Sequence, residues 1–135
     1  MRDRIKASFA RQSMMRTFGA TLDSIEPGLV TISAPILPGS RQQQGFAHAA
    51  VTFGLGGSAA GYAALTTLPE DQEVVTAEIK INLIAPATGD RLIAKGRVVK
   101  PGRRLIVVTS EVFVINGDTE TLVALLQGTM VPVQA

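Results

Sequence analysis

The chain has 135 residues, no cysteine, a single histidine and a net charge of +2. This length suits one domain with one hydrophobic core. The slight net charge, without a block of Lys and Arg interleaved with aromatic residues, argues against nucleic-acid binding. The lack of cysteine excludes a disulfide framework and a thiolate metal site, and one histidine excludes a histidine-rich site. We therefore expect neither a metal nor a cofactor.

Apolar composition points to an oligomer. Hydrophobic residues make up 46% of the chain and charged residues only 18%, which is little polar cover for a monomer of this size.

The start, Met1 to Lys6, mixes both charges without an apolar segment, so a cytoplasmic location is expected. Residues 42–69 carry no formal charge if His48 is neutral, but five glycines and many alanines favour a buried helix over a membrane span.

The first part of the chain predicts a helix and a hairpin. Residues 3–18 place Ile5 and Phe9 on one side and basic residues on the other, which indicates a short amphipathic cover helix. Residues 20–25 and 29–36 form a predicted hairpin around Pro27 and Gly28, because Pro fixes one turn dihedral and Gly allows the positive one.

Four strands are predicted after the charge-free segment. They cover residues 74–85, 91–99, 105–115 and 121–133, and the Asn116-Gly117-Asp118 turn joins the last two. In the first strand, alternation places one set of side chains on one face, Thr76, Glu78, Lys80 and Asn82, and the other set on the opposite face, Val75, Ala77, Ile79 and Ile81.

The order strand, strand, long helix and four strands predicts an α+β fold, with one antiparallel sheet wrapped around one long central helix. A lone helix and a lone sheet each have one face to bury, so they cover one another. We expect residues 1–135 to form a single domain, with residues 1–18 as its N-terminal cover helix.

A polar cluster precedes the central helix. Gln42, Gly45 and His48 come just before the small, uncharged residues 49–65, and a strand from Thr76 to Pro86 follows the helix. With these motifs in this order, residues 18–131 resemble the hotdog-fold acyl-CoA thioesterases of the phenylacetic acid degradation type. The resemblance implies hydrolysis of an acyl- or aryl-CoA thioester to the free acid and coenzyme A, with CoA as part of the substrate. It also implies a homodimer or homotetramer with sites at the subunit interface, and no membrane partner.

The helix start suits thioester chemistry. Free backbone N–H groups at a helix N-terminus, here those of Ala49 and Ala50, polarise a carbonyl as negative charge grows on its oxygen. Gln42 and His48 would orient the ester or the attacking water. The family commonly has Gly after the histidine, and Ala49 keeps the same donor. Alternatively, His48 simply satisfies a loop carbonyl.

One position departs from the family pattern. Where the family carries an Asp or Glu, nine residues after the histidine, this chain has Gly57. Nine helical residues span about 13.5 Å, so a group there would serve the partner's site rather than its own. Ser58 is a candidate for positioning a water, although it is a weak base and nucleophile without a His or Lys beside it. Glu78 reads more readily as a surface pair with Lys80 than as a base.

Small residues recur along the helix at three- and four-residue spacing: Ala50, Gly54, Gly57, Gly61 and Ala64. Each helical glycine costs about 1 kcal/mol relative to Ala, so something must compensate. Either the stripe packs tightly against the sheet or a partner's helix, or it forms a channel for an acyl group.

Basic residues offer a place for the phosphates of coenzyme A. Lys100, Arg103 and Arg104 lie around a Pro-Gly turn, and Arg41 precedes the three glutamines. An ordinary basic hairpin turn explains the first three equally well. The resemblance adds Gly45 and Asn82 to the substrate-binding residues.

Three function classes follow. The first is an acyl-CoA thioesterase with a water nucleophile and a helix-terminus oxyanion site. The second is a non-catalytic acyl-CoA binding protein of the same fold, in which Gly57 marks lost chemistry. The third is a hotdog dehydratase, which the missing acid disfavours.

Overall fold

The computed structural model describes residues 1–135 and contains four helical elements and six strands. They follow in the order α1 (Arg2–Ala10), α2 (Ser13–Phe18), β1 (Thr21–Glu26), β2 (Leu29–Pro35), the 3-10 turn η1 (Pro38–Ser40), α3 (Ala49–Leu65), β3 (Gln72–Leu83), β4 (Arg91–Lys100), β5 (Ile106–Asn116) and β6 (Thr119–Gln134). No helix is both long enough and apolar enough to cross a bilayer.

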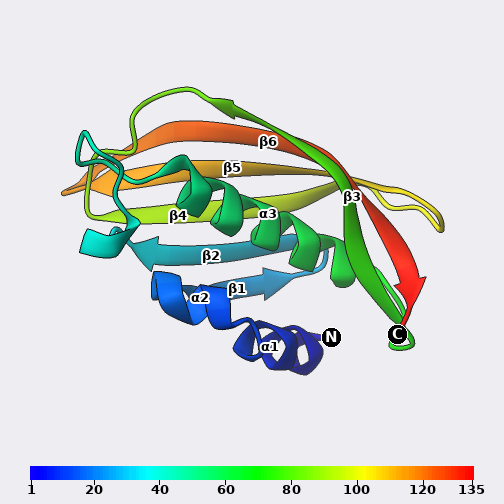
Figure 1. Cartoon of the computed structure of the whole chain (residues 1–135). Helices are drawn as coiled ribbons and strands as arrows, with labels where there is room; N and C mark the ends of the chain where they lie inside the picture. Colours follow the sequence, from blue (N-terminus) through cyan, green and yellow to red (C-terminus); the bar gives the residue numbers. More distant parts are fainter.

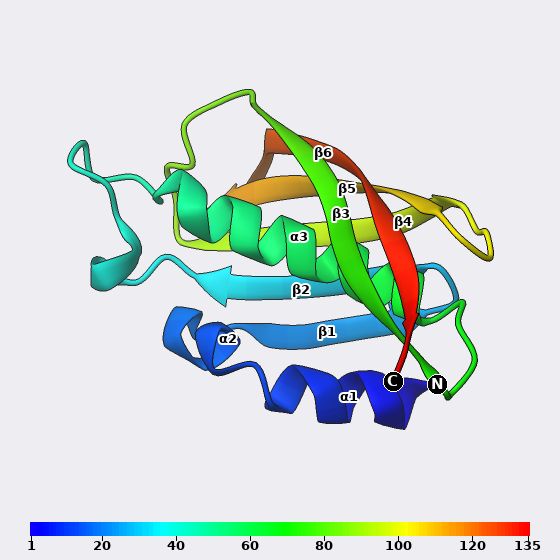
Figure 2. The ribbon, with the colours of Figure 1, turned by 45° about the vertical axis from the view of Figure 1, so that its right-hand side comes forward.

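The six strands form one antiparallel sheet in the order β1-β2-β4-β5-β6-β3, so β3 and β1 are its edges. Figures 1 and 2 show the sheet curving around α3, with α1 and α2 below β1. The core lies between the helix and the concave face, where inward side chains of alternate strand positions, including Ile32, Leu92 and Val112, meet Leu55 of α3. The predicted sheet around one helix is therefore confirmed.

Gly96 lets the helix approach the sheet closely. A Cβ atom at this position of β4 would meet the backbone of Ala59 and Ala60 in α3. The helix supplies the matching small surface there, because Ala59 and Ala60 are fully buried. Close packing of backbone on backbone is what the run of small residues in α3 makes possible on this side.

The predicted N-terminal helix is two helices rather than one. The prediction of a continuous helix over residues 3–18 was wrong, because the chain breaks at Arg11 and Gln12. Gln12 has extended backbone dihedrals of −81° and 96°. The break lets both Ile5 and Met15 reach the core, whereas Met14 remains 56% exposed.

A β-bulge changes the predicted faces of β3. The register with β6 shifts between Thr76 and Glu78, so one residue of β3 has no pairing partner on β6. As a result Thr76 turns inward and donates to the sulfur of Met130 at 3.2 Å, while Val75 is 49% exposed. The alternation predicted for this strand holds only after the bulge.

Both predicted hairpin turns are present. Gly28 between β1 and β2 and Gly117 between β5 and β6 have φ angles of 73° and 61°. Only glycine adopts this left-handed conformation at no steric cost, which explains why each turn carries one at that position.

Candidate functional site

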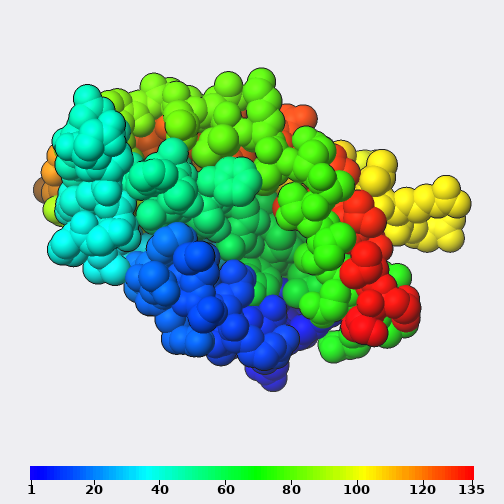
Figure 3. All heavy atoms as spheres, in the orientation of Figure 1, coloured from blue at the N-terminus to red at the C-terminus, as the bar shows by residue number.

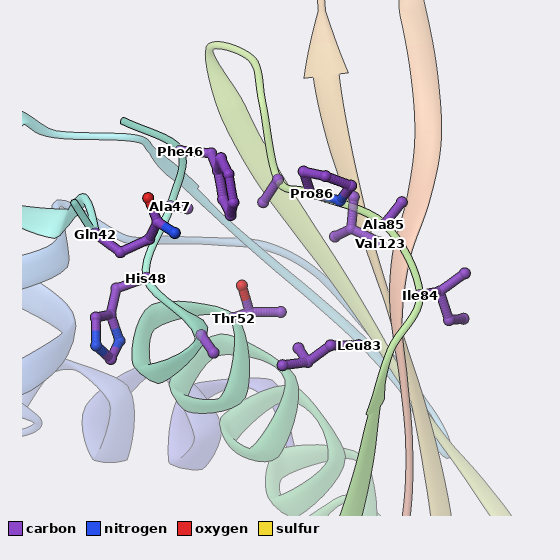
Figure 4. Close-up of a pocket in the computed structure, with 12 residues that line it drawn as sticks. Gln42, Phe46, Ala47, His48, Thr52, Leu83, Ile84, Ala85, Pro86 and Val123 are labelled. Carbon is purple, nitrogen blue, oxygen red and sulfur yellow. The ribbon is translucent and has the colours of Figure 1, made fainter. Parts of the chain in front are cut away.

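A cavity of about 430 Å³ lies at the N-terminal end of α3. One wall is the loop that carries Gln42, Phe46 and Ala47, and the floor is the first turn of α3 with His48, Ala49 and Thr52. The opposite wall consists of the end of β3 and the following loop, with Leu83, Ile84, Ala85, Pro86 and Ala87, together with Val123 of β6 (Figure 4). The structure thus brings three of the predicted residues, Gln42, His48 and Ala49, to one cavity.

The loop before α3 is held by its own hydrogen bonds. Gln42 N–H donates to the carbonyl of Phe46 at 2.9 Å, and Gly45 has a φ angle of 94° at the loop tip. Arg41 donates to the carbonyl oxygens of Gly45 at 2.7 Å and Ile36 at 3.0 Å. Arg41 therefore fastens this loop through two of its five guanidinium N–H donors, and its role as a phosphate ligand stays a prediction.

His48 is the N-cap of α3. Its Nδ1 accepts the backbone N–H of Ala50 at 2.9 Å, and its carbonyl accepts the N–H of Val51 at 3.0 Å. Because Nδ1 accepts, the neutral ring carries its proton on Nε2. Figure 4 shows the imidazole pointing away from Leu83 and Pro86 on the far cavity wall.

The capping bond changes which backbone donor is available. The N–H of Ala50 is already bound by His48, so the prediction that both Ala49 and Ala50 offer free donors is corrected. Ala49 is the first residue of α3, so its N–H has no carbonyl one turn earlier in the helix, and it makes no other hydrogen bond in the chain. Ala49 lines the cavity, and its N–H is the one donor of the first turn left to polarise an oxygen atom of a ligand there.

Thr52 is a polar residue of the cavity that the sequence did not indicate. It is only 2% exposed, and its hydroxyl makes no hydrogen bond within the chain. Figure 4 shows this hydroxyl pointing from α3 into the space below Phe46. It can bind a water one helical turn away from the N–H of Ala49. A lone threonine in a run of small residues carries no sequence signal for such a role.

Gly57 and Ser58 lie in a second cavity, of about 440 Å³, farther along the same helix. Its floor is α3 from Phe53 to Leu65, one wall is Ser8 and Gln12 from the N-terminal helices, and the other is β3 with Met130 of β6. Figure 3 shows the hollow between the N-terminal helices in blue, α3 in green and β3 in light green. Within one chain, Gly57 is therefore separate from the cavity of His48.

The small-residue stripe of α3 faces three different surroundings. A Cβ at Gly54 would meet the Phe18 ring at 2.9 Å, so that position is packed against α2. At Gly57 the only neighbour would be Phe53 at 4.0 Å, and at Gly61 there would be none. Ala64 is fully buried against the core. Packing explains Gly54 and Ala64, whereas Gly57 and Gly61 leave open space in the second cavity.

Asn82 does not approach either cavity. It lies with Glu78 and Lys80 in a hollow on the outer face of the sheet, beside Leu125 and Gln127 of β6. Glu78 accepts a hydrogen bond from Thr129 at 2.8 Å rather than pairing with Lys80. Within one chain, Asn82 is thus on the opposite face of the sheet from α3.

The predicted phosphate ligands lie at the far end of the molecule. Lys100 ends β4, and Arg103 and Arg104 are exposed in the loop before β5. This loop projects in yellow at the right of Figure 1, whereas α3 begins at the left. Arg103 borders a hollow together with Gln72, the first residue of β3. One chain alone does not bring these cations to the cavity of His48.

Comparison with known proteins decides the family. Residues 44–121 match the model of the thioesterase superfamily, and this range is more than half of the chain. The chain belongs to the thioesterase superfamily. A thioesterase family protein from Silicibacter pomeroyi has a solved structure with a TM-score of 0.95 and 37% identity, over 97% of this chain and 96% of that one. The hotdog fold is thereby established for this superfamily member.

Two further solved structures are informative. A protein from Bacillus halodurans, solved with CoA, is 25% identical with a TM-score of 0.81, over 97% of this chain and 84% of that one. The PaaI protein of E. coli, from the phenylacetic acid degradation operon, is 20% identical with a TM-score of 0.85, over 96% and 91% of the two chains. At that identity the likeness concerns the fold alone. No curated protein sequence matched the chain.

Proposed function

We propose that this thioesterase superfamily member hydrolyses acyl-CoA thioesters, with the cavity at the start of α3 holding the thioester carbonyl. The observation that carries the proposal is the unbonded N–H of Ala49, a residue that lines the cavity at the positive end of a 17-residue helix. Such a donor stabilises the negative charge that develops on the carbonyl oxygen when water attacks. Most of the other residues that line the cavity are apolar, and an apolar surrounding strengthens such an interaction.

His48 then acts as a positioning residue. By capping Ala50 it fixes the first turn of α3 and leaves the N–H of Ala49 as the only free donor of that turn. Thr52 supplies an unbonded hydroxyl on the same cavity for the attacking water, and Gln42, whose amide is bonded to Gln44, retains one N–H donor there. In this proposal His48 orders the backbone at the start of α3 and transfers no proton.

A homodimer formed through β3 completes the site. β3 is a 12-residue edge strand with β6 as its only partner, so half of its backbone N–H and C=O groups are free. Val75 and Leu83 on this strand are 49% and 59% exposed, and Phe53 of α3 is 40% exposed. Pairing of two β3 strands would extend the sheet across both subunits and cover these apolar side chains.

The geometry of that pairing joins the two cavities. A two-fold axis requires the two β3 strands to run antiparallel, so the Leu83 end of one lies beside the Gln72 end of the other. Leu83 borders the cavity of Ala49, and Glu73, Val74 and Ile79 border the cavity of Gly57. The carbonyl held at Ala49 would therefore lie near Gly57 of the partner subunit, and the acyl group would enter that second cavity.

The same arrangement supplies cations for coenzyme A. Arg103 borders the same hollow as Gln72, the first residue of β3. In an antiparallel pair of β3 strands, the Gln72 end of the partner's strand is near the first subunit's cavity. The partner's basic loop of Lys100, Arg103 and Arg104 would lie at that end of the strand and therefore near the same cavity. Flexible cations at a cavity rim suit the phosphates of coenzyme A. The structure from Bacillus halodurans with CoA supports this class of ligand.

A non-catalytic acyl-CoA binding protein is the second candidate. It is favoured by one observation, that Gly57 offers no carboxylate where the resembled family has one. Both candidate functions involve the same two cavities and the same dimer, and both have acyl-CoA of the cytoplasm as their ligand. They differ only in turnover.

Release of free thiol from a panel of aryl- and alkyl-CoA thioesters tests the proposal. The thioesterase account predicts steady turnover of at least one member at a rate well above the uncatalysed hydrolysis. Binding without turnover across the panel would favour the acyl-CoA binding protein. Sedimentation at micromolar concentration tests the assembly, and a monomer under those conditions would contradict the joined site.

A further inference from the structure

A third cavity, of about 390 Å³, also borders His48. It lies between Phe18 of α2, Ser40 and Arg41 at the end of η1, and the first turn of α3. His48 is the only residue that it shares with the cavity proposed for the thioester. The imidazole points away from the far wall of that first cavity (Figure 4). His48 therefore stands between two separate cavities.

Three side chains of the third cavity have hydrogen-bond donors that no group in the chain accepts. His48 carries its proton on Nε2, because Nδ1 accepts the N–H of Ala50, and this Nε2–H makes no hydrogen bond. Ser40 is only 7% exposed, and its hydroxyl makes none either. Arg41 uses two of its five guanidinium donors on carbonyl oxygens, so three remain. A buried hydroxyl without a partner is costly, which points to a ligand that supplies the missing acceptors.

The backbone holds these donors in place. The carbonyl of Ser40 accepts the N–H of His48 at 2.9 Å, and Arg41 pairs with Ala47 in an isolated antiparallel bridge. The segment that carries Ser40 and Arg41 is thus bonded directly to the segment that carries His48. Because the site is formed before a ligand arrives, binding has little chain ordering to offset.

The charge of the cavity suits an anion. No Asp or Glu is among its lining residues, Arg41 carries a full positive charge, and the start of α3 adds the positive end of the helix dipole. A phosphate group has three terminal oxygens, so each of the three side chains can donate to an oxygen of its own. The lining also includes Phe18, Leu37 and Val51, which suit a small organic group attached to the phosphate.

We propose that the third cavity binds a phosphate group, free or at the end of a small phosphomonoester, through His48 Nε2, Ser40 and Arg41, and that this ligand strengthens the cap of α3. An anion that accepts the Nε2–H fixes the tautomer of the imidazole and makes the other ring nitrogen a better acceptor. The bond from the N–H of Ala50 to Nδ1 is then stronger. This inference goes beyond the proposed hydrolysis and does not depend on it, since both effects are measured without a thioester.

Calorimetric titration with inorganic phosphate at pH 8 tests the site. We expect the wild-type protein to bind with a Kd of about 1 mM or lower. Ser40→Ala removes a hydroxyl that has no partner in the chain, and His48→Asn removes the Nε2–H but keeps a cap. Each variant should bind phosphate about tenfold more weakly. Ser24→Ala is the matched control, because Ser24 is exposed on β1 and borders none of the three cavities, and it should keep the wild-type Kd.

The same titration with phenyl phosphate separates the two sources of the phosphate group. Tighter binding of phenyl phosphate than of inorganic phosphate, reduced in Ser40→Ala, would assign the site to a phosphomonoester. Equal or weaker binding of phenyl phosphate would assign it to the free ion. Phosphate that does not bind in the millimolar range, or that binds equally to the wild type, Ser40→Ala and His48→Asn, would overturn the site.

Hydrogen exchange of the Ala50 amide tests the effect on the cap. Saturating phosphate should slow this exchange about threefold or more in the wild type and less in Ser40→Ala at the same concentration. Phosphate also stabilises folded proteins in general, and the comparison removes this effect because it acts on both proteins alike. Unchanged or faster exchange in the phosphate-bound wild type would overturn the effect on the cap.

Competition with a non-hydrolysable acyl-CoA thioether shows whether the site is separate from that of coenzyme A. The thioether is proposed to bind in the other two cavities, so it should leave the Kd for phosphate within about threefold of its original value. Displacement of phosphate by the thioether would overturn a separate site, because the cavity would then hold a phosphate of the substrate itself. Absence of thioester turnover would contradict the proposed hydrolysis and leave the phosphate result intact.

Discussion

The Nδ1 atom of His48 accepts the backbone N–H of Ala50 at 2.9 Å, and this bond leaves Ala49 as the one free donor in the first turn of α3. His48 is thus the cap of α3, and in the proposed function it contributes to activity through the backbone that it orders. Substitutions that separate capping from imidazole chemistry distinguish this role from that of a proton-transfer group.

For His48, we expect Asn and Ala to behave differently. Asn is a strong N-cap and its side chain can accept the same N–H, whereas Ala removes the cap at a cost of about 1 kcal/mol of unfolding free energy. His48→Asn should therefore keep kcat within about threefold of the wild type, and His48→Ala should lower it about tenfold or more. Urea unfolding and thiol-release kinetics on both variants measure the two effects. Equal loss of kcat in the stable Asn variant would instead make the imidazole itself essential.

For Gly57, an introduced carboxylate should raise activity. A Cβ there meets only Phe53 at 4.0 Å, so Gly57→Asp is accommodated within the chain, and replacing a helical glycine carries no propensity cost. A positioned acid or base is typically worth about 10²- to 10⁴-fold in rate, and we expect an increase of at least tenfold in kcat in a variant that still dimerises.

Gly61→Asp is the control for that gain. Gly61 is also open, about one helical turn further from the partner's carbonyl in the proposed dimer. It should leave kcat unchanged or lower. An unchanged or reduced rate in a dimeric Gly57→Asp protein, on every thioester tested, would show that catalysis uses another group, with Ser58-bound water and Glu78 as the next candidates.

For Gly96, an added methyl should destabilise the fold. The Cβ of Gly96→Ala would meet the backbone of Ala59 and Ala60, which cannot rotate away as a side chain does. We expect a loss of about 3 kcal/mol in unfolding free energy, at the upper end of the usual cost of overpacking. Gly39→Ala is the matched control, since a Cβ there meets nothing within 4 Å. Similar urea midpoints for the two variants would contradict the close approach of α3 to β4.

The start of α3 was predictable from the sequence, because a polar cluster followed by 17 uncharged and mostly small residues is a local pattern. The hairpin turns at Gly28 and Gly117 were predictable for the same reason. The faces of β3 were not, since the bulge at Thr76 depends on its register with β6, more than 40 residues away in the sequence.

The candidate site was only partly predictable. Gln42, His48 and Ala49 are close in sequence and share a cavity. The second cavity combines Gln12 with Tyr62, and their contact depends on how α1 and α2 fold back against α3. Asn82 was predicted near the substrate, but the alternation of β3 after its bulge places it on the outer face.

The activity of Ala49→Pro tests the proposed oxyanion site at the start of α3 most directly. Proline is well tolerated as the first residue of a helix, and His48, with φ and ψ of −64° and 141°, already has the extended conformation that a following proline requires. The substitution therefore removes the N–H of Ala49 and little else. Ala49→Gly, which keeps this donor, is its control.

If the N–H of Ala49 stabilises the developing oxyanion, Ala49→Pro should retain its fold and its affinity for a non-hydrolysable thioether, while kcat falls about 10²- to 10³-fold. Ala49→Gly should stay within about threefold of the wild type. A folded, ligand-binding Ala49→Pro protein with kcat close to that of the wild type would contradict the central claim that the start of α3 is the oxyanion site.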